Sequence, residues 1–175
     1  MNVALVPQSD ARFHWSLDYV KRHPFQTVGI GLVLAMRYFF AVFFIYGFWH
    51  KLVREWMWTD IMQQHFIDRY SEIDPLSFQA LYLQYFGIPF YLPIAWVVTI
   101  GELIIGVALV FGAATRANAA FGLFMLLNFA AGAFYNEWIV ILSATAILFI
   151  IFPTGHWLGV DKRLHEKYPH SIWFK

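Results

Sequence analysis

The fold is decided by residues 28–50, VGIGLVLAMRYFFAVFFIYGFWH, in which Arg37 is the one charged residue. A helix needs roughly 20 mostly apolar residues to cross the hydrocarbon core of a bilayer, because each residue rises about 1.5 Å along the helix axis. This stretch is long enough and apolar enough to do so. We therefore predict a transmembrane helix over 28–50, with a charge inside it.

Three further apolar segments follow, at 91–111, 117–134 and 138–152. The last two are short for spans, so they must lie nearly upright or in a thin region of the membrane. Charged residues make up 13% of the chain, about half the fraction that is usual in a soluble domain. The sequence therefore predicts an all-α fold: an integral membrane four-helix bundle that forms one domain over residues 1–175.

The segment 53–89, between the first two spans, is too polar to cross a membrane. Aromatic and aliphatic residues recur in it at near-helical spacing with charges between them: Trp56, Trp58, Ile61, Met62, Phe66 and Tyr70. This pattern indicates one or two amphipathic helices lying on the outer face. The segment is either a membrane-surface anchor or a lid or docking surface for a partner.

Lysines and arginines indicate the orientation of the chain. With four spans, one side of the membrane holds eight of them: Arg12, Lys21, Arg22, Arg116, Lys162, Arg163, Lys167 and Lys175. The other side holds three: Lys51, Arg54 and Arg69. Cytoplasmic loops carry the excess of positive residues. We expect a multi-pass protein of the inner (cytoplasmic) membrane of a prokaryote, with both termini in the cytoplasm.

Three polar residues are expected near one depth. Arg37 lies about 13 Å into the first helix, counted from its cytoplasmic start, and Glu102 about 15 Å into the second, counted from its outer start. Asn128 falls at a similar depth in the third. An isolated charge there costs at least about 2.5 kcal/mol, so we predict that Arg37 and Glu102 form a pair. The pair either fixes helix register or lines a site for protons or for a polar head group, such as a quinone carbonyl.

Four residues near the membrane surfaces complete the candidate site. Trp49 and His50 end the first helix, where Trp49 fits an aromatic belt. His50 is either merely interfacial or exchanges protons with a substrate. On the cytoplasmic side, Arg116 is expected to contact lipid phosphates. Asp161 is expected to cap the helix that follows it or to pair with Arg116.

Several classes of function lack their motifs in this sequence. It contains no glycine-rich phosphate loop, zinc signature, nucleophile elbow or nucleic-acid-binding motif, and no cysteine. No two histidines have the placement that haem ligation needs, so we expect neither a metal nor haem. A redox role would therefore have to use a quinone or a partner subunit. A solute or proton transporter has less support, because no inverted repeat or broken helix is visible.

The chain resembles the DoxX family of small bacterial membrane proteins over roughly residues 34–164. The resemblance rests on the order and spacing of these elements: Arg37, Gly47-Phe48-Trp49-His50-Lys51-Leu52, Gly101-Glu102-Leu103, Gly112-Ala113-Ala114-Thr115-Arg116, Asn128 and Leu158-Gly159-Val160-Asp161. The outer segment 53–89 is larger than expected for the family.

The resemblance implies a four-helix bundle with a redox association, because related members include the membrane subunits of archaeal thiosulfate:quinone oxidoreductase. The expected function is that of a membrane subunit in quinone-linked electron transfer, with thiosulfate:quinone oxidoreduction as the candidate reaction. Arg37, Glu102 and His50 would be catalytic, and quinone would be bound with the help of Trp49, Asn128, Arg116 and Asp161. The alternative is a non-catalytic accessory or scaffold subunit of a larger respiratory or photosynthetic membrane complex. The bilayer and partner subunits are the expected partners, and homo-oligomerisation is left open.

Overall fold

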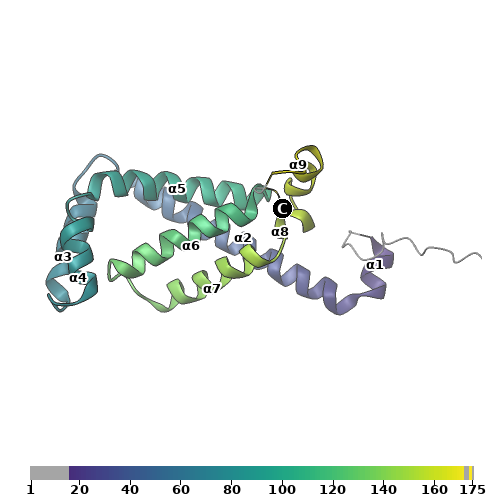
Figure 1. Cartoon of the computed structure of the whole chain (residues 1–175), viewed down its shortest axis with the longest axis horizontal. Helices are drawn as coiled ribbons and strands as arrows, with labels where there is room; N and C mark the ends of the chain where they lie inside the picture. The colour runs from purple at the N-terminus through teal and green to yellow at the C-terminus, as the bar shows by residue number, and fades with distance from the viewer. Residues whose placement is uncertain (1–15, 172–173, 175) are drawn as a thin grey trace, which may run out of the picture.

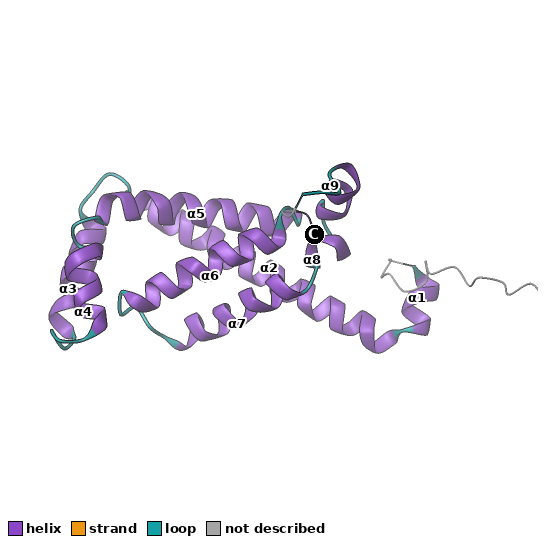
Figure 2. Cartoon of the chain, in the orientation of Figure 1, coloured by secondary structure: helices purple, strands orange, loops and turns teal. Residues whose placement is uncertain are grey.

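The computed structural model describes residues 16–171 and residue 174. Within these residues all regular secondary structure is helical, so the predicted all-α class is confirmed (Figure 2). Arg12 and Lys175, which the charge comparison includes, lie outside the described residues. The elements are α1 Leu17–Arg22, α2 Pro24–Val53, α3 Ile61–Glu72, α4 Phe78–Tyr82, a π-helix Leu83–Gly87, α5 Tyr91–Phe111, α6 Thr115–Ala131, α7 Glu137–Ile151, α8 Thr154–Trp157 and α9 Asp161–Lys167.

Four helices make the main packing contacts. Helix α2 packs against α5 and α7, and α6 packs against the same two helices (Figure 1). They meet at a core of buried apolar residues that includes Phe40, Phe44, Ile105, Leu109, Leu126, Leu142 and Phe149. Close side-chain packing of this kind holds helices together where lipid tails leave little hydrophobic drive for association.

Local sequence sets several helix ends. Pro24 begins α2, a position where its missing N–H removes no helical hydrogen bond. Helix α5 ends at Gly112, which adopts a left-handed conformation with φ of 64°. The side chain of Asn136 accepts a hydrogen bond from the Ile139 N–H and thereby caps α7. Helix α7 ends before Pro153, because the residue preceding a proline avoids helical geometry.

Residues 61–87 form a separate layer, which we call the cap layer. It consists of α3, α4 and the π-helix, and it runs across one end of the four packed helices (Figure 1). The layer is attached through α3 to α5 and through α4 to α6. We call this end of the molecule the cap end, and the opposite end, where α8 and α9 lie, the tail end.

Helix α2 is longer than its neighbours and extends beyond them. It has 30 residues, whereas α5 has 21. Its first buried residue is Leu34 and Val33 already packs against the core, so residues 24–32 project past the tail end (Figure 1). A Cβ added to Gly29 or Gly31 would meet nothing within 4 Å. The observed helix begins four residues before the expected start at residue 28 and ends three residues after the expected end at residue 50.

The remaining bounds differ little from the expected ones. Helix α5 occupies the same residues as the second expected span, 91–111. Helix α6 begins two residues before the expected 117 and ends three before 134, and α7 is displaced by one residue from 138–152. By length and composition, two of the described helices could cross a membrane, α2 and α5, while α7 is apolar but shorter.

Candidate polar site at the cap end

Lys51 and Glu102 form an ion pair between α2 and α5. The Lys51 Nζ donates to both carboxylate oxygens of Glu102, at 2.7 and 2.8 Å. The side chains are 13% and 4% exposed, respectively. A pair so far removed from solvent is held strongly once formed, because removing one partner leaves an uncompensated charge in an apolar environment.

Gly47 makes room for the carboxylate. A Cβ at this position would lie 2.8 Å from Oε1 and 2.9 Å from Cδ of Glu102. Gly47 and Lys51 are four residues apart and therefore occupy the same face of α2. Along this face, the glycine leaves space for the Glu102 carboxylate and the lysine reaches it one turn later.

Aromatic and imidazole rings surround the lysine on its cap side. Lys51 Nζ lies 5.4 Å from the ring centroid of Trp56, within the range of a cation–π contact. The Trp56 ring is in turn 5.2 Å from the ring of His65 and 6.3 Å from that of His50. His50 and Trp56 are half-buried and His65 is exposed, so this ring cluster extends from Lys51 to the surface.

Arg37 lies at the tail end and has no carboxylate partner among the described residues. It is fully buried. Its Nη1 donates to the carbonyl oxygen of Thr154 at 2.7 Å, and its Nη2 to that of Leu158 at 2.6 Å and to the Tyr38 hydroxyl at 3.3 Å. The guanidinium therefore fastens the segment after α7 to α2.

Asp161 fastens the same segment to the start of α6. Its carboxylate accepts hydrogen bonds from the Ala114 N–H at 2.6 Å, the Thr115 N–H at 3.0 Å and the Thr115 hydroxyl at 2.8 Å. Ala114 itself provides no side-chain cap, so Asp161 caps α6 from a distant part of the chain and its negative charge suits the helix N-terminus. The expectations that Asp161 caps its own helix or pairs with Arg116 are wrong.

Glycines allow this segment to approach closely. A Cβ at Gly112 would lie 2.7 Å from the Cα of Gly159, and a Cβ at Gly155 would overlap the carboxylate of Asp161. We call the assembly of Arg37, Gly112, Thr115 and the segment 154–161 the tail clasp. Its hydrogen bonds go mostly to backbone groups, with the Thr115 hydroxyl as a side-chain partner of Asp161, which is the pattern of a structural element.

The predicted Arg37–Glu102 pair is wrong. Arg37 lies beside Gly112, the residue that ends α5, whereas Glu102 lies beside Gly47. Arg37 precedes Gly47 by ten residues on α2, and Glu102 precedes Gly112 by ten residues on α5. At 1.5 Å per residue, Arg37 and Glu102 are therefore about 15 Å apart along the helices. The depth estimate fails because the projecting start of α2 places Arg37 level with the tail-end terminus of α5.

Asn128 belongs to neither charged group. Its Oδ1 accepts a hydrogen bond from the Tyr82 hydroxyl at 2.8 Å, and its Nδ2 donates to the Phe124 carbonyl at 2.8 Å. Burial raises the pKa of Tyr82, so the hydroxyl keeps the proton that it donates. Asn128 therefore joins α6 to the cap layer and does not link Arg37 to Glu102.

Trp49 and Arg116 take no part in the ion pair either. The Trp49 side chain is 60% exposed and faces outward near the end of α2. Arg116 donates from Nη2 to the Ile151 carbonyl at 3.2 Å, which ties the start of α6 to the end of α7. Of the predicted site residues, the structure gathers Glu102 and His50 around Lys51.

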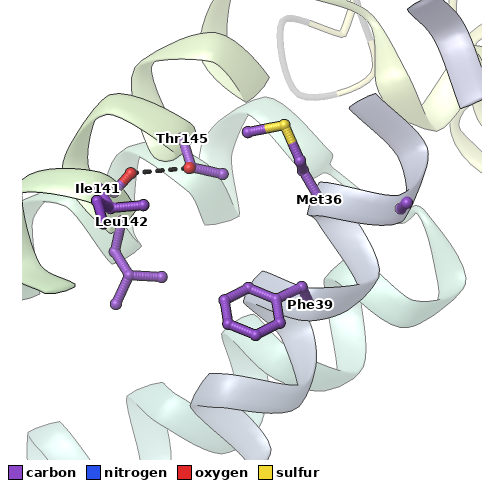
Figure 3. A pocket seen from close by; sticks show the side chains of 6 residues that line it. Met36, Phe39, Ile141, Leu142 and Thr145 are labelled. Atoms are coloured by element: carbon purple, nitrogen blue, oxygen red, sulfur yellow. Dashed lines mark hydrogen bonds between the residues drawn. The ribbon is translucent and has the colours of Figure 1, made fainter. Parts of the chain in front are cut away.

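A groove of about 330 Å³ lies between α2 and α7 (Figure 3). It is lined by Ala35, Met36, Phe39, Ile141, Leu142 and Thr145. The Thr145 hydroxyl already donates to the Ile141 carbonyl at 2.8 Å, so the lining offers almost solely apolar contacts. None of the predicted site residues lines this groove.

Metal ligation finds no support in the described part of the chain, which contains no group of three or more histidine, aspartate or glutamate side chains close enough to hold an ion. The chemistry available at the cap end is that of a buried carboxylate, an ammonium group and nearby imidazoles. The ammonium and imidazole groups can donate hydrogen bonds to an oxygen atom, and the carboxylate and imidazoles can exchange protons with it.

Comparison with known families identifies the chain. The DoxX family model matches residues 32–136, well over half of the sequence. The chain belongs to the DoxX family. As a DoxX protein with apolar helices it is a membrane protein, and it contacts lipid. No curated protein and no solved structure matches the chain.

The DoxX match ends at Asn136, immediately before α7 begins. It therefore includes Arg37, Lys51 and Glu102 but not the segment 154–161 of the tail clasp. The ion pair lies within the part of the chain that defines the family, whereas one half of the clasp lies outside it.

Sequence reasoning missed Lys51 as the partner of Glu102. The signal was present, since Gly47 and Lys51 share a helix face and a glycine one turn before a lysine leaves space for an acidic side chain. Trp56, which contacts Lys51, was assigned only to an amphipathic pattern. Its contact with Lys51 depends on the turn after α2, where Glu55 adopts a φ of 57°.

Proposed function

We propose that this DoxX protein is a four-span subunit of the inner membrane in which the Lys51–Glu102 pair holds a quinone head group during quinone-linked electron transfer. The observation that carries the proposal is an ion pair between α2 and α5, nearly excluded from solvent, among otherwise apolar residues. An intramembrane ionisable group is by default a candidate functional site.

The residues fit such a ligand. The ammonium group of Lys51 can donate a hydrogen bond to a head-group oxygen, and the Glu102 carboxylate can give or take a proton there. The apolar residues of α2 and α5 suit an apolar ring. When bound, a quinone supplies the electron acceptor, and the electrons come from a redox centre in a partner subunit. Thiosulfate oxidation by such a partner remains the specific reaction that the family resemblance suggests.

The proposed topology places α2, α5, α6 and α7 across the membrane, with the cap end outside and the tail end in the cytoplasm. The apolar surfaces of these four helices and the positive residues near the tail end, such as Lys162 and Arg163, support it. The cap layer would then lie at the outer surface. In that arrangement, the ring cluster of His50, Trp56 and His65 separates the ion pair from the outer aqueous phase.

A double substitution tests the role of the ion pair. Replacing a buried ion pair by apolar or neutral groups of similar volume is often neutral for stability, whereas removing one partner is costly. The variant Lys51→Met/Glu102→Gln should therefore remain folded while its Kd for decylubiquinone in lipid nanodiscs weakens about tenfold to hundredfold. Glu137→Gln, which changes an exposed carboxylate on α7, is the matched control. Unchanged affinity in a folded double variant would contradict the proposal.

The second candidate function is that of a non-catalytic accessory subunit. The projecting start of α2 favours it, since residues 24–32 carry no charge and none of them is buried. A partner helix could pack there. If so, Leu32→Ser should release a co-purifying membrane subunit from the native complex, as measured by mass spectrometry, and leave quinone affinity unchanged. Retention of every subunit would exclude this surface as the attachment site.

A further inference from the structure

Two buried polar atoms close to the ion pair make no hydrogen bond within the described part of the chain. They are the hydroxyl oxygen of Thr99 and the indole nitrogen of Trp56. Thr99 is completely buried. Buried polar groups in native structures nearly always have partners, and leaving one unpaired costs free energy. Each of these atoms therefore calls for an explanation.

Thr99 lacks the local hydrogen bond that two other threonines inside long helices make. Thr27 in α2 and Thr145 in α7 each donate to the carbonyl four residues earlier, at 2.9 and 2.8 Å, whereas the hydroxyl of Thr154, at the start of the short α8, is unpaired like that of Thr99. This local bond is the usual way for a threonine to satisfy its hydroxyl inside a helix. Thr99 does not make it, so its hydroxyl is available to a group outside its own helix.

Both atoms lie on the cap side of the ion pair. Thr99 precedes Glu102 by three residues on α5 and so shares its face. Helical side chains lean toward the helix N-terminus, which for α5 is the cap end. Trp56 reaches the pair from the other direction, with its ring 5.4 Å from Lys51 Nζ. The two free polar atoms thus flank the same ion pair from α5 and from the turn after α2.

The chemistry of these atoms restricts the ligand. An indole N–H can only donate a hydrogen bond, whereas a threonine hydroxyl can donate or accept one. Lys51 and Glu102 neutralise each other, so the site favours an uncharged ligand. A head group with carbonyl or hydroxyl oxygens on an apolar ring has this chemistry in both its oxidised and its reduced form.

We propose that Trp56 and Thr99 are the specificity-determining residues of the cap-end site, and that they hydrogen-bond the ring oxygens of an uncharged quinone-type head group. The inference rests on the proposed function and deepens it. Lys51 and Glu102 provide the charged part of the site, and Trp56 and Thr99 provide neutral hydrogen bonds that distinguish an oxygen-bearing ring from a lipid chain.

Substitutions that remove the two polar atoms test this assignment: Thr99→Val is near-isosteric, whereas Trp56→Phe also removes the five-membered part of the indole ring. Trp56→Phe and Thr99→Val should each weaken the Kd for decylubiquinone in nanodiscs about threefold to tenfold. The Tm of ligand-free Thr99→Val should stay the same or rise, since this substitution removes an unpaired buried hydroxyl and keeps the volume. Trp56→Phe also loses ring volume, so this variant is judged by its Kd alone. The matched controls are Trp58→Phe, which changes an exposed tryptophan, and Thr145→Val, which changes a threonine with a local partner.

The outcomes separate this inference from the function on which it rests. Unchanged Kd values for Trp56→Phe and Thr99→Val, with binding lost in Lys51→Met/Glu102→Gln, would overturn the assignment alone. A lowered Tm of ligand-free Thr99→Val would also overturn it, because it would show that the hydroxyl has a partner within the protein. Failure of the unsubstituted protein to bind decylubiquinone would overturn the proposed function itself.

Discussion

Arg37 and Glu102 are both buried, yet their charges are accommodated in different ways. Arg37 donates to two backbone carbonyls at the tail end, and Glu102 accepts from a lysine ammonium near the cap end. The guanidinium has planar, forked donor geometry that reaches two separate carbonyls at once. Arg37 is thereby suited to joining chain segments, whereas the flexible ammonium of Lys51 can exchange one oxygen partner for another.

Substitution of Arg37 should change stability and leave binding unaffected. Arg37→Lys keeps the charge but cannot make both carbonyl bonds, so we expect a loss of about 2 kcal/mol in the free energy of unfolding. The measurement is an SDS titration of the purified protein in mixed micelles, followed by the decylubiquinone Kd in nanodiscs. A Kd that rises as much as in Lys51→Met/Glu102→Gln would place Arg37 in the binding site and contradict the separation of the two ends.

Residue types were easier to predict from sequence than residue partners. The charges inside apolar segments identified Arg37 and Glu102 as buried, and both are. Their relative level could not be predicted, because it depends on how far α2 extends past α5, which a count from each helix start does not fix. The capping of α6 by Asp161 was equally hidden, since the two lie far apart in sequence and meet only through Gly112, Gly155 and Gly159.

At the scale of the elements, the contact between α2 and α5 positions the ion pair. Gly106 allows the two helices to approach, because a Cβ there would lie 2.5 Å from Cγ1 of Ile45 and 3.1 Å from the Ala41 carbonyl oxygen. Backbone atoms cannot move aside as a flexible side chain can. The distance between Lys51 and Glu102 therefore depends on a small residue at position 106.

Gly106→Ala should separate the two helices. We expect the free energy of unfolding to fall by about 2 kcal/mol, the usual cost of overpacking a close contact. Gly29→Ala is the control, since nothing lies within 4 Å of its added Cβ and alanine favours a helix by about 0.5 kcal/mol or more. The SDS titration compares the two variants. Equal stability of both would show that α2 and α5 do not pack as closely as described.

The helices themselves were largely predictable, because apolar length and Pro153 act locally. Pro24 is a local signal too, but the expected start at residue 28 does not use it. The exceptions have non-local or conformational causes. Helix α6 begins before its expected start because Asp161 caps it from the distant tail clasp. Ala114 and Ala133 adopt positive φ values of 44° and 63° in the turns on either side of α6, conformations that an alanine does not signal. The π-helix Leu83–Gly87 likewise has no recognisable marker in sequence.

At the scale of the whole molecule, the cap layer and the tail clasp occupy opposite ends of the packed helices (Figure 1). The proposed topology puts a membrane between them. The exposed apolar residues along the four helices, including Val42, Val97, Ile104, Leu127 and Ile147, would face lipid. The ion pair would then lie near the middle of α5, farther from the cytoplasm than the clasp.

The sequence has no cysteine, which makes the topology directly measurable. Asp68→Cys, in α3 of the cap layer, should react with a membrane-impermeant maleimide added to intact cells. Lys162→Cys, in α9, should react only after the membrane is opened, because the tail end is cytoplasmic. Labelling is read on a gel after purification. The reverse pattern would invert the orientation, and labelling of both positions in intact cells would contradict the placement of a membrane between them.

The central claim is that a quinone head group binds at Lys51–Glu102, and locating a bound quinone tests it most directly. A quinone with a photoreactive group on its ring would be irradiated with the protein in nanodiscs, and the modified residues identified by mass spectrometry. The account predicts labels within residues 47–58 and 95–102, which excess decylubiquinone removes. Labels confined to the groove between α2 and α7, at Met36, Phe39 or Ile141, or to the tail clasp around Arg37, would contradict it.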